Sequence, residues 1–78
     1  MRLEIISVGR GSDQKGKELI IFKGRNGHGV SELVVVPNSP ELARIPRGTL
    51  IERHPTGLDT RQIDILDVNG AVLKSIQL

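Results

Sequence analysis

Apolar residues in this chain of 78 residues gather in short runs, which segments rich in glycine, proline or polar residues separate. Runs of this length fit strands better than helices, and β-branched residues dominate most of them. The first run contains the adjacent pair Ile5 and Ile6, which breaks strict alternation and predicts a β-bulge or a strand that is apolar on both faces. The six predicted strands cover residues 1–8, 18–23, 30–36, 49–53, 61–68 and 71–78.

The segments between the runs predict turns. Residues 9–17 hold three glycines among polar neighbours, which predicts a mobile loop. Asn26-Gly27 and Asn69-Gly70 predict type I′ hairpin turns, because both central residues of such a turn need positive φ. Residues 54–57 predict a further turn.

One segment has helical features. Ser39 is a suitable N-cap, Pro40 fits the first helical position, and the carboxylate of Glu41 favours the positive start of a helix. Pro46 cannot continue a helix. The pattern predicts about two helical turns over residues 38–45.

The order of elements is therefore three strands, a helical turn and three strands, within a single small β domain over residues 1–78. This is too short for two full sheets, so we expect a partly open barrel of SH3-like or OB-like kind, with about five to six antiparallel strands. A flat sheet covered by the short helix is the alternative. In the fifth strand, alternation points Ile63, Ile65 and Val68 inward. Three polar residues of that strand point outward, namely Gln62, Asp64 and Asp67.

Composition excludes several kinds of site. The chain has no cysteine, and its two histidines, His28 and His54, have no partner at metal-ligand spacing, so we expect no disulfide, metal or cofactor. Phe22 is the only aromatic residue, which leaves no platform for base stacking. No apolar run is long enough for a signal peptide or a membrane span, so we expect a cytoplasmic protein without membrane contact.

Catalytic motifs are weak. The pattern Gly11-x-x-x-x-Gly16-Lys17 resembles a phosphate-binding loop, but Glu18 stands where a magnesium-binding hydroxyl is required, and a strand follows instead of a helix. A triad of Ser39, His54 and Asp59 lacks any nucleophile elbow. We therefore expect no catalytic residues; an enzyme would need a site shared between subunits.

The net charge of +2 is concentrated near the amino terminus. The basic residues border the glycine-rich segments 9–17 and 24–29, where backbone amides can approach a phosphate or an acidic partner. A strand separates the two segments, so these residues are expected to form a stripe and not a pocket. The predicted contact residues are Arg10, Lys15, Lys17, Lys23 and Arg25.

Two other features favour a protein partner. Arg44, Arg47 and Arg53 alternate with acids, as rim charges of an interface do. The last strand ends without charge, so Ile76 and Leu78 are candidates for edge pairing and homo-oligomerisation. We therefore expect a non-catalytic interaction module, such as a small regulator or assembly component. The alternative is a small nucleic-acid-binding barrel that contacts phosphates through its basic loops.

Overall fold

The computed structural model describes residues 2–56 and 59–78, with the side chains of Thr56 and Asp59 excepted. The described chain is mainly β: six antiparallel strands form one sheet in the order β3-β2-β1-β4-β5-β6, and six strands are what the sequence predicts. The elements are β1 (Arg2–Ser12), β2 (Glu18–Arg25), β3 (Ser31–Pro37), α1 (Pro40–Ala43), β4 (Leu50–Thr56), β5 (Asp59–Leu66) and β6 (Val72–Gln77).

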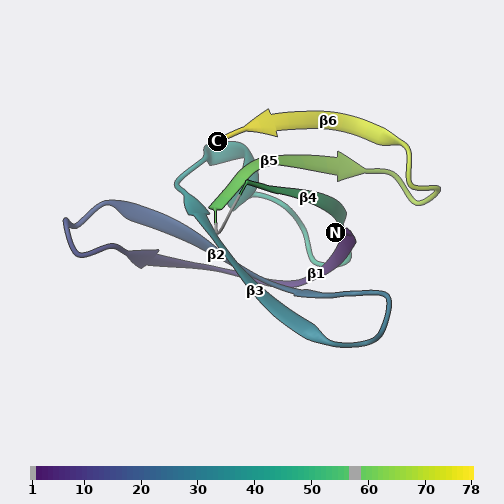
Figure 1. Ribbon diagram of the computed structural model, residues 1–78, viewed down its shortest axis with the longest axis horizontal. Helices are drawn as coiled ribbons and strands as arrows, with labels where there is room; N and C mark the ends of the chain where they lie inside the picture. Colours follow the sequence, from purple (N-terminus) through teal and green to yellow (C-terminus); the bar gives the residue numbers. More distant parts are fainter. Residues whose placement is uncertain (1, 57–58) are drawn as a thin grey trace.

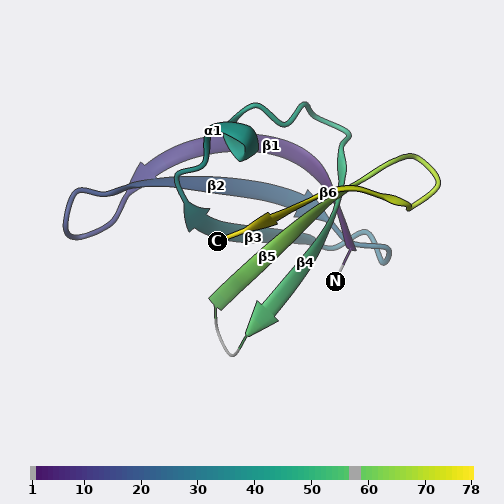
Figure 2. The same cartoon turned by 90° about the horizontal axis from the view of Figure 1, so that it is seen from above.

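The sheet folds over itself around β1, so that β1–β3 form one layer and β4–β6 the other (Figure 1). The first residues of β1 pair with β4, and the remainder pairs with β2. The register slips between Ile5 and Ser7, which confirms the predicted bulge. At this point the Ile5 amide donates to the Thr49 carbonyl, and the Gly48 amide donates to the Ile5 carbonyl, both at 2.8 Å. Figure 2 shows β4 and β5 crossing the direction of β1–β3 steeply.

The core lies between the two layers and is almost entirely aliphatic. Strand alternation sends one side chain in two to this interior. Phe22 is fully buried in it. The other core residues are Leu3, Ile5, Ile20, Val34, Val36, Leu42, Ile45, Ile51, Ile63 and Ile76.

The short helix contributes to this core through one residue. Ser39 is the N-cap, its hydroxyl accepting from the Leu42 amide at 3.5 Å, and Pro40 begins the helix, as predicted. The helix has four residues, so it forms one turn and not two. Leu42 is fully buried, and Glu41 forms an ion pair with Lys74 of β6. The short helix α1 therefore fixes the connection between β3 and β4, which joins the two layers.

Three of the hairpins close with the same turn, a repeat that the sequence pattern did not predict. Each turn starts at an Asp or Asn whose side-chain oxygen accepts two backbone amides, at distances of 2.8–3.1 Å. The backbone carbonyl of that first residue accepts the amide of a glycine three positions later, at 3.0 Å. Each of these glycines has positive φ. The turns are Asp13–Gly16, Asn26–Gly29 and Asp67–Gly70.

The predicted type I′ turns are therefore wrong. Among the described residues, only glycines have positive φ, so neither Asn26 nor Asn69 adopts the conformation that such a turn requires. Asn26 occupies the first position of its turn, and Asn69 occupies the third position of another. The geometry matches a three-residue loop in which glycine occupies the left-handed position of a bulge. The side-chain acceptor at the first position decides the turn type here.

The predicted loop over residues 9–17 is confirmed only for residues 13–17, which connect β1 to β2; its first four residues belong to β1. β1 continues to Ser12, and Gly9 and Gly11 pair with Ile21 and Leu19 of β2. A strand needs backbone hydrogen bonds and not side chains, so glycines are tolerated where a neighbour fills the space. Ile21 does this, since a Cβ at Gly11 would lie 3.0 Å from its Cδ1 atom.

Two predictions near β4 and β5 also fail. His54 and Pro55 belong to β4 instead of a turn, and the register slips between them, where proline is tolerated in a strand. Gly57, the last residue of that predicted turn, lies outside the described residues. Val68 is not inward; it sits in the turn between β5 and β6 and is 92% exposed.

The turn assignment predicts opposite effects for the two glycines of one hairpin. Gly29→Ala should lower the free energy of unfolding by about 1 kcal/mol or more, because alanine is strained at positive φ. Gly27→Ala should have little effect or stabilise slightly, since Gly27 has no positive φ and no atom within 4 Å of the new methyl group. Urea unfolding of both variants tests this. A larger loss of stability for Gly27→Ala than for Gly29→Ala would contradict this assignment and support the type I′ turn.

Candidate functional site

The outer face of β2 and β3 carries aliphatic side chains, of which the two on β3 are exposed and the two on β2 are half-buried. Leu33 and Val35 point outward because Val34 and Val36 occupy the core, and they are 69% and 52% exposed. In the register, Lys23 lies opposite Leu33, and Ile21 lies opposite Val35. We call the outward residues Leu19, Ile21, Lys23, Leu33, Val35 and Pro37 the β2–β3 outer face.

The neighbouring strand leaves this face open. The residues of β1 that pair with Leu19, Ile21 and Lys23 are Gly11, Gly9 and Ser7. Their side chains are absent or small, so β1 provides a flat margin beside the aliphatic residues. Neighbouring exposed aliphatic residues on one sheet face, unlike residues scattered singly, are typical of an interaction surface.

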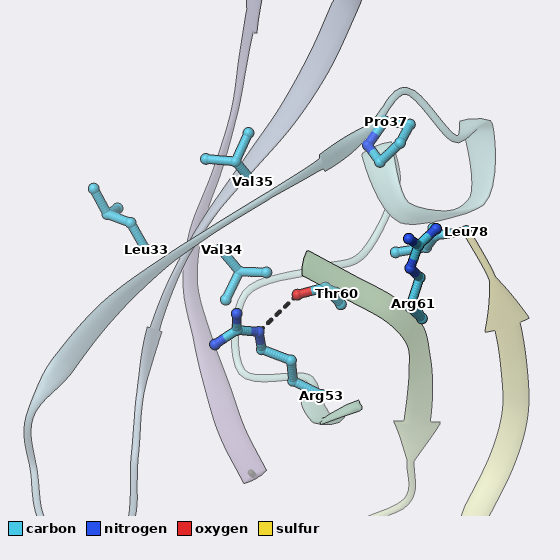
Figure 3. A pocket seen from close by; sticks show the side chains of 8 residues that line it. All are labelled: Leu33, Val34, Val35, Pro37, Arg53, Thr60, Arg61 and Leu78. Carbon is cyan, nitrogen blue, oxygen red and sulfur yellow. Dashed lines mark hydrogen bonds between the residues drawn. The ribbon is translucent and has the colours of Figure 1, made fainter. Parts of the chain in front are cut away.

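A groove runs along the free edge of β3. It has a volume of about 490 Å³ and lies where β3 approaches β5. Val34 points from β3 toward Arg53, whereas Leu33 and Val35 point to the other side of the strand (Figure 3). The Arg53 Nε atom donates to the Thr60 hydroxyl at 2.7 Å. We call this the edge groove; it is lined by Leu33, Val34, Val35, Pro37, Arg53, Thr60, Arg61 and Leu78.

The structure does not bring the predicted basic residues into one cluster. Lys15 and Lys17 belong to the β1–β2 turn, while Lys23 and Arg25 lie toward the opposite end of β2 (Figure 1). Arg10 pairs with the buried Ile20, so its side chain lies on the face of the sheet opposite to the one that carries Lys23 and Arg25. Of the five, Lys23 and Arg25 alone share the outward side of β2.

The residues predicted for a protein interface also separate. Arg44 and Arg47 lie on the connection from α1 to β4, whereas Arg53 and Leu78 line the edge groove. Ile76 is in the core, opposite Ile63, and is only 9% exposed.

β6 does lie at an edge of the sheet, as the hypothesis of edge pairing requires. Its exposed aliphatic residues are Val72 and Leu73.

A polar cluster on the outward face of β4–β6 is the second candidate site. Asp64, predicted to face solvent, does point away from the core but is buried under its neighbours. His54 Nε2 lies 2.8 Å from its Oδ2 atom, and Gln62 Nε2 donates to Oδ1 at 2.7 Å. Gln77 extends the cluster by donating to Gln62 at 2.8 Å. Ser75 lies opposite Asp64 on β6.

Hydrogen bonds to the Asp64 carboxylate, first from Ser75 and then from Gln62 and His54, lower its pKa from 3.8 to about 2. The ionised carboxylate only accepts, so His54 Nε2 carries the proton in this contact. Ser75 and His54 thus both bond to Asp64, whereas a catalytic nucleophile must bond to the histidine. The cluster can hold strands together but does not activate a serine. The Asp59 side chain of the sequence-based triad lies outside the described residues.

Other classes of site receive no support from the described residues. No group of three or more histidine, cysteine or acidic side chains among them is placed to hold a metal ion. Within the same part of the chain, no helix has the length and apolar character to cross a bilayer. Comparisons with protein-family models, with curated proteins and with solved structures found no match.

The sequence contains a signal for the outer face that strand prediction alone does not use. Leu33 to Val36 is an uninterrupted aliphatic run. A strand points alternate side chains to opposite faces, so such a run must place two aliphatic residues outside unless the sheet is covered on both sides. The edge groove has no such signal, because it joins strands far apart in the sequence.

The pKa of Asp64 predicts an acid-sensitive contribution to stability. The pKa of Asp64 is about 2 in the folded chain, below its ordinary value of 3.8. The ionised carboxylate therefore contributes fully to the free energy of unfolding well above pH 3.8, and this contribution is lost as the pH falls through 3.8 toward about 2. Asp64→Asn should flatten the pH dependence of the free energy of unfolding in that window. Asp13→Asn is the control, because asparagine makes the same turn at Asn26. Equal flattening in both variants would contradict the role of Asp64.

Proposed function

We propose that this chain is a non-catalytic interaction module that binds a protein partner through the β2–β3 outer face, as a small regulator or assembly component does. The observation that carries the proposal is the exposure of Leu33 and Val35 on an open sheet face. Burying a fully exposed aliphatic side chain of this size contributes about 1.5–3 kcal/mol. Leu33 and Val35 are 69% and 52% exposed, so each can contribute a part of that on binding.

A protein partner fits this surface better than other ligands do. The face is mainly aliphatic, with Lys23 within it and Arg25 at its end on β2, and protein interfaces have apolar centres with polar rims. Single-stranded nucleic acids are bound on aromatic platforms, and Phe22, the chain's one aromatic side chain, is buried in the core. In the His54–Asp64 cluster, no serine is bonded to the histidine, as a serine nucleophile would have to be. This supports a non-catalytic function.

We further propose that the folded-over sheet is a partly open barrel of OB-like kind, with β6 as an added strand. The bend of β1 between two layers and the approach of β3 to β5 support this type. In OB folds, the face of the second and third strands binds oligonucleotides or oligosaccharides, so this likeness by itself favours the nucleic-acid alternative considered below. The SH3-like type is the alternative.

Capture from extracts tests the protein-binding proposal. The wild-type chain should retain specific proteins after nuclease treatment, and the double variant Leu33→Thr with Val35→Thr should retain about tenfold less or none, because aliphatic contacts are removed. Threonine keeps the strand propensity, so the fold should persist. Val68→Thr is the matched control, since Val68 is exposed outside the face. Undiminished capture by the double variant would contradict the proposal.

The alternative function is binding to a nucleic acid backbone, which Lys23 and Arg25 favour because they share the outward side of β2. Affinity for a labelled single-stranded oligonucleotide should then fall steeply with salt. Lys23→Gln with Arg25→Gln should lower the logarithmic salt slope by roughly 0.7 for each phosphate that is no longer neutralised. Lys15→Ala with Lys17→Ala reports whether the distant turn also contributes. No binding at low salt would end this alternative.

A further inference from the structure

We infer that Asn69 and Gly70, at the tip of the β5–β6 hairpin, form a site of spontaneous deamidation that the guanidinium group of Arg2 promotes (Figure 1). This modification does not depend on the proposed function. It is a covalent change in the chain itself, which replaces an uncharged side chain by an acidic one.

The reaction uses an asparagine side chain and the backbone of the residue that follows it. The amide nitrogen of Gly70 loses its proton and attacks Cγ of Asn69, the bond from Cγ to the side-chain nitrogen breaks, and ammonia leaves with a proton taken from water. A second water molecule then adds to one carbonyl carbon of the cyclic imide and opens the ring to aspartate or isoaspartate. No electrons are exchanged, and water is the only co-reactant. A following glycine favours ring closure because it has no side chain to hinder the attack and its backbone is permissive.

The structure protects one of the two asparagines that precede a glycine. The Oδ1 atom of Asn26 accepts the backbone amides of His28 and Val30 at 2.9 and 3.1 Å, so its side chain is fixed at the first position of its turn. This side chain must rotate to meet the nitrogen of Gly27, and both hydrogen bonds are then lost. Asn26 is therefore held away from the reaction.

The side chain of Asn69 is not held in this way. Asn69 occupies the third position of its turn, where its side chain is exposed and forms no hydrogen bond with the described residues. Its backbone amide donates to Asp67 Oδ1 at 2.8 Å. The Gly70 amide donates to the Asp67 carbonyl at 3.0 Å, so one hydrogen bond must open before the attack. The obstacle is smaller than at Asn26, where two bonds hold the group that is attacked.

The guanidinium group of Arg2 lies against Gly70. A Cβ atom at Gly70 would be 2.8 Å from Nη1 and 3.4 Å from Cζ of Arg2. Arg2 forms no ion pair with the described residues, so no carboxylate among them neutralises its charge. A fixed positive charge stabilises the anionic nitrogen of Gly70 and the oxyanion that forms at Asn69 during the attack. A Cβ atom at Gly27 would have no atom within 4 Å.

The products alter the hairpin in two ways. Either product adds one negative charge to a chain whose net charge is +2. Isoaspartate also lengthens the backbone between the two amides that bond to Asp67, so the turn loses its geometry. The β5–β6 hairpin is weakened as a result.

Peptide mapping tests the inference on the folded chain, kept in mildly alkaline buffer and then digested with trypsin. The peptide of residues 62–74 should acquire the mass of the acid at Asn69 about tenfold faster than the peptide of residues 26–44 acquires it at Asn26, because more hydrogen bonds must break there and Arg2 is absent. Fragment masses locate the change within each peptide. In urea the two rates should become equal, since each asparagine then precedes a glycine in an unfolded chain.

Variants of Arg2 separate the charge from the packing. Arg2→Gln should slow the reaction at Asn69 several-fold in the folded chain and leave it unchanged in urea, whereas Arg2→Lys should retain most of the rate. Arg25→Gln is the matched control, because it removes an arginine from β2 and leaves the β5–β6 turn intact. Equal rates at Asn69 and Asn26 in the folded chain overturn the inference. A rate at Asn69 that Arg2→Gln does not lower overturns it as well.

Discussion

The sharing of β1 between two layers is the constraint on which the remaining structure depends. One strand cannot pair with both β2 and β4 in different layers unless it bends, and the bulge between Ile5 and Ser7 provides the bend. The Ile5 amide and carbonyl bond to Thr49 and Gly48 at this point, so the bend leaves neither group of Ile5 unpaired. Gly24 permits the close approach there, because a Cβ would lie 3.0 Å from that of Leu3.

The folded-over sheet explains how so small a chain forms a core with no cysteine and only one aromatic residue. The bend brings the inward faces of β1–β3 against those of β4–β6, and Leu42 of α1 joins the core they form. The same bend leaves β3 and β6 as edges that no other strand of the order covers. The candidate binding surface is thus a consequence of the way the core closes: the outer face and free edge of β3 are what the closure does not bury.

The polar cluster at Asp64 belongs to the stability of the second layer. Asp64 lies on β5, and its partners come from β4, β5 and β6, so the carboxylate links three strands on the face away from the core. Buried carboxylates normally need such partners. Sequence alternation placed Asp64 on the correct face but suggested solvent exposure, because alternation says nothing about the neighbours that cover a residue.

Local patterns of residues were sufficient to predict the six strands and their order around a capped helical turn, the bulge at Ile5–Ile6, and the inward positions of Ile63 and Ile65. Each depends on periodicity or on residues that are neighbours in the chain. The turn type, the extension of β1 through its glycines, the burial of Asp64 and Ile76, and the edge groove were decided only by the tertiary structure. These features depend on cross-strand register and on strands that are distant in sequence, such as β3 and β5, and no local pattern encodes those contacts.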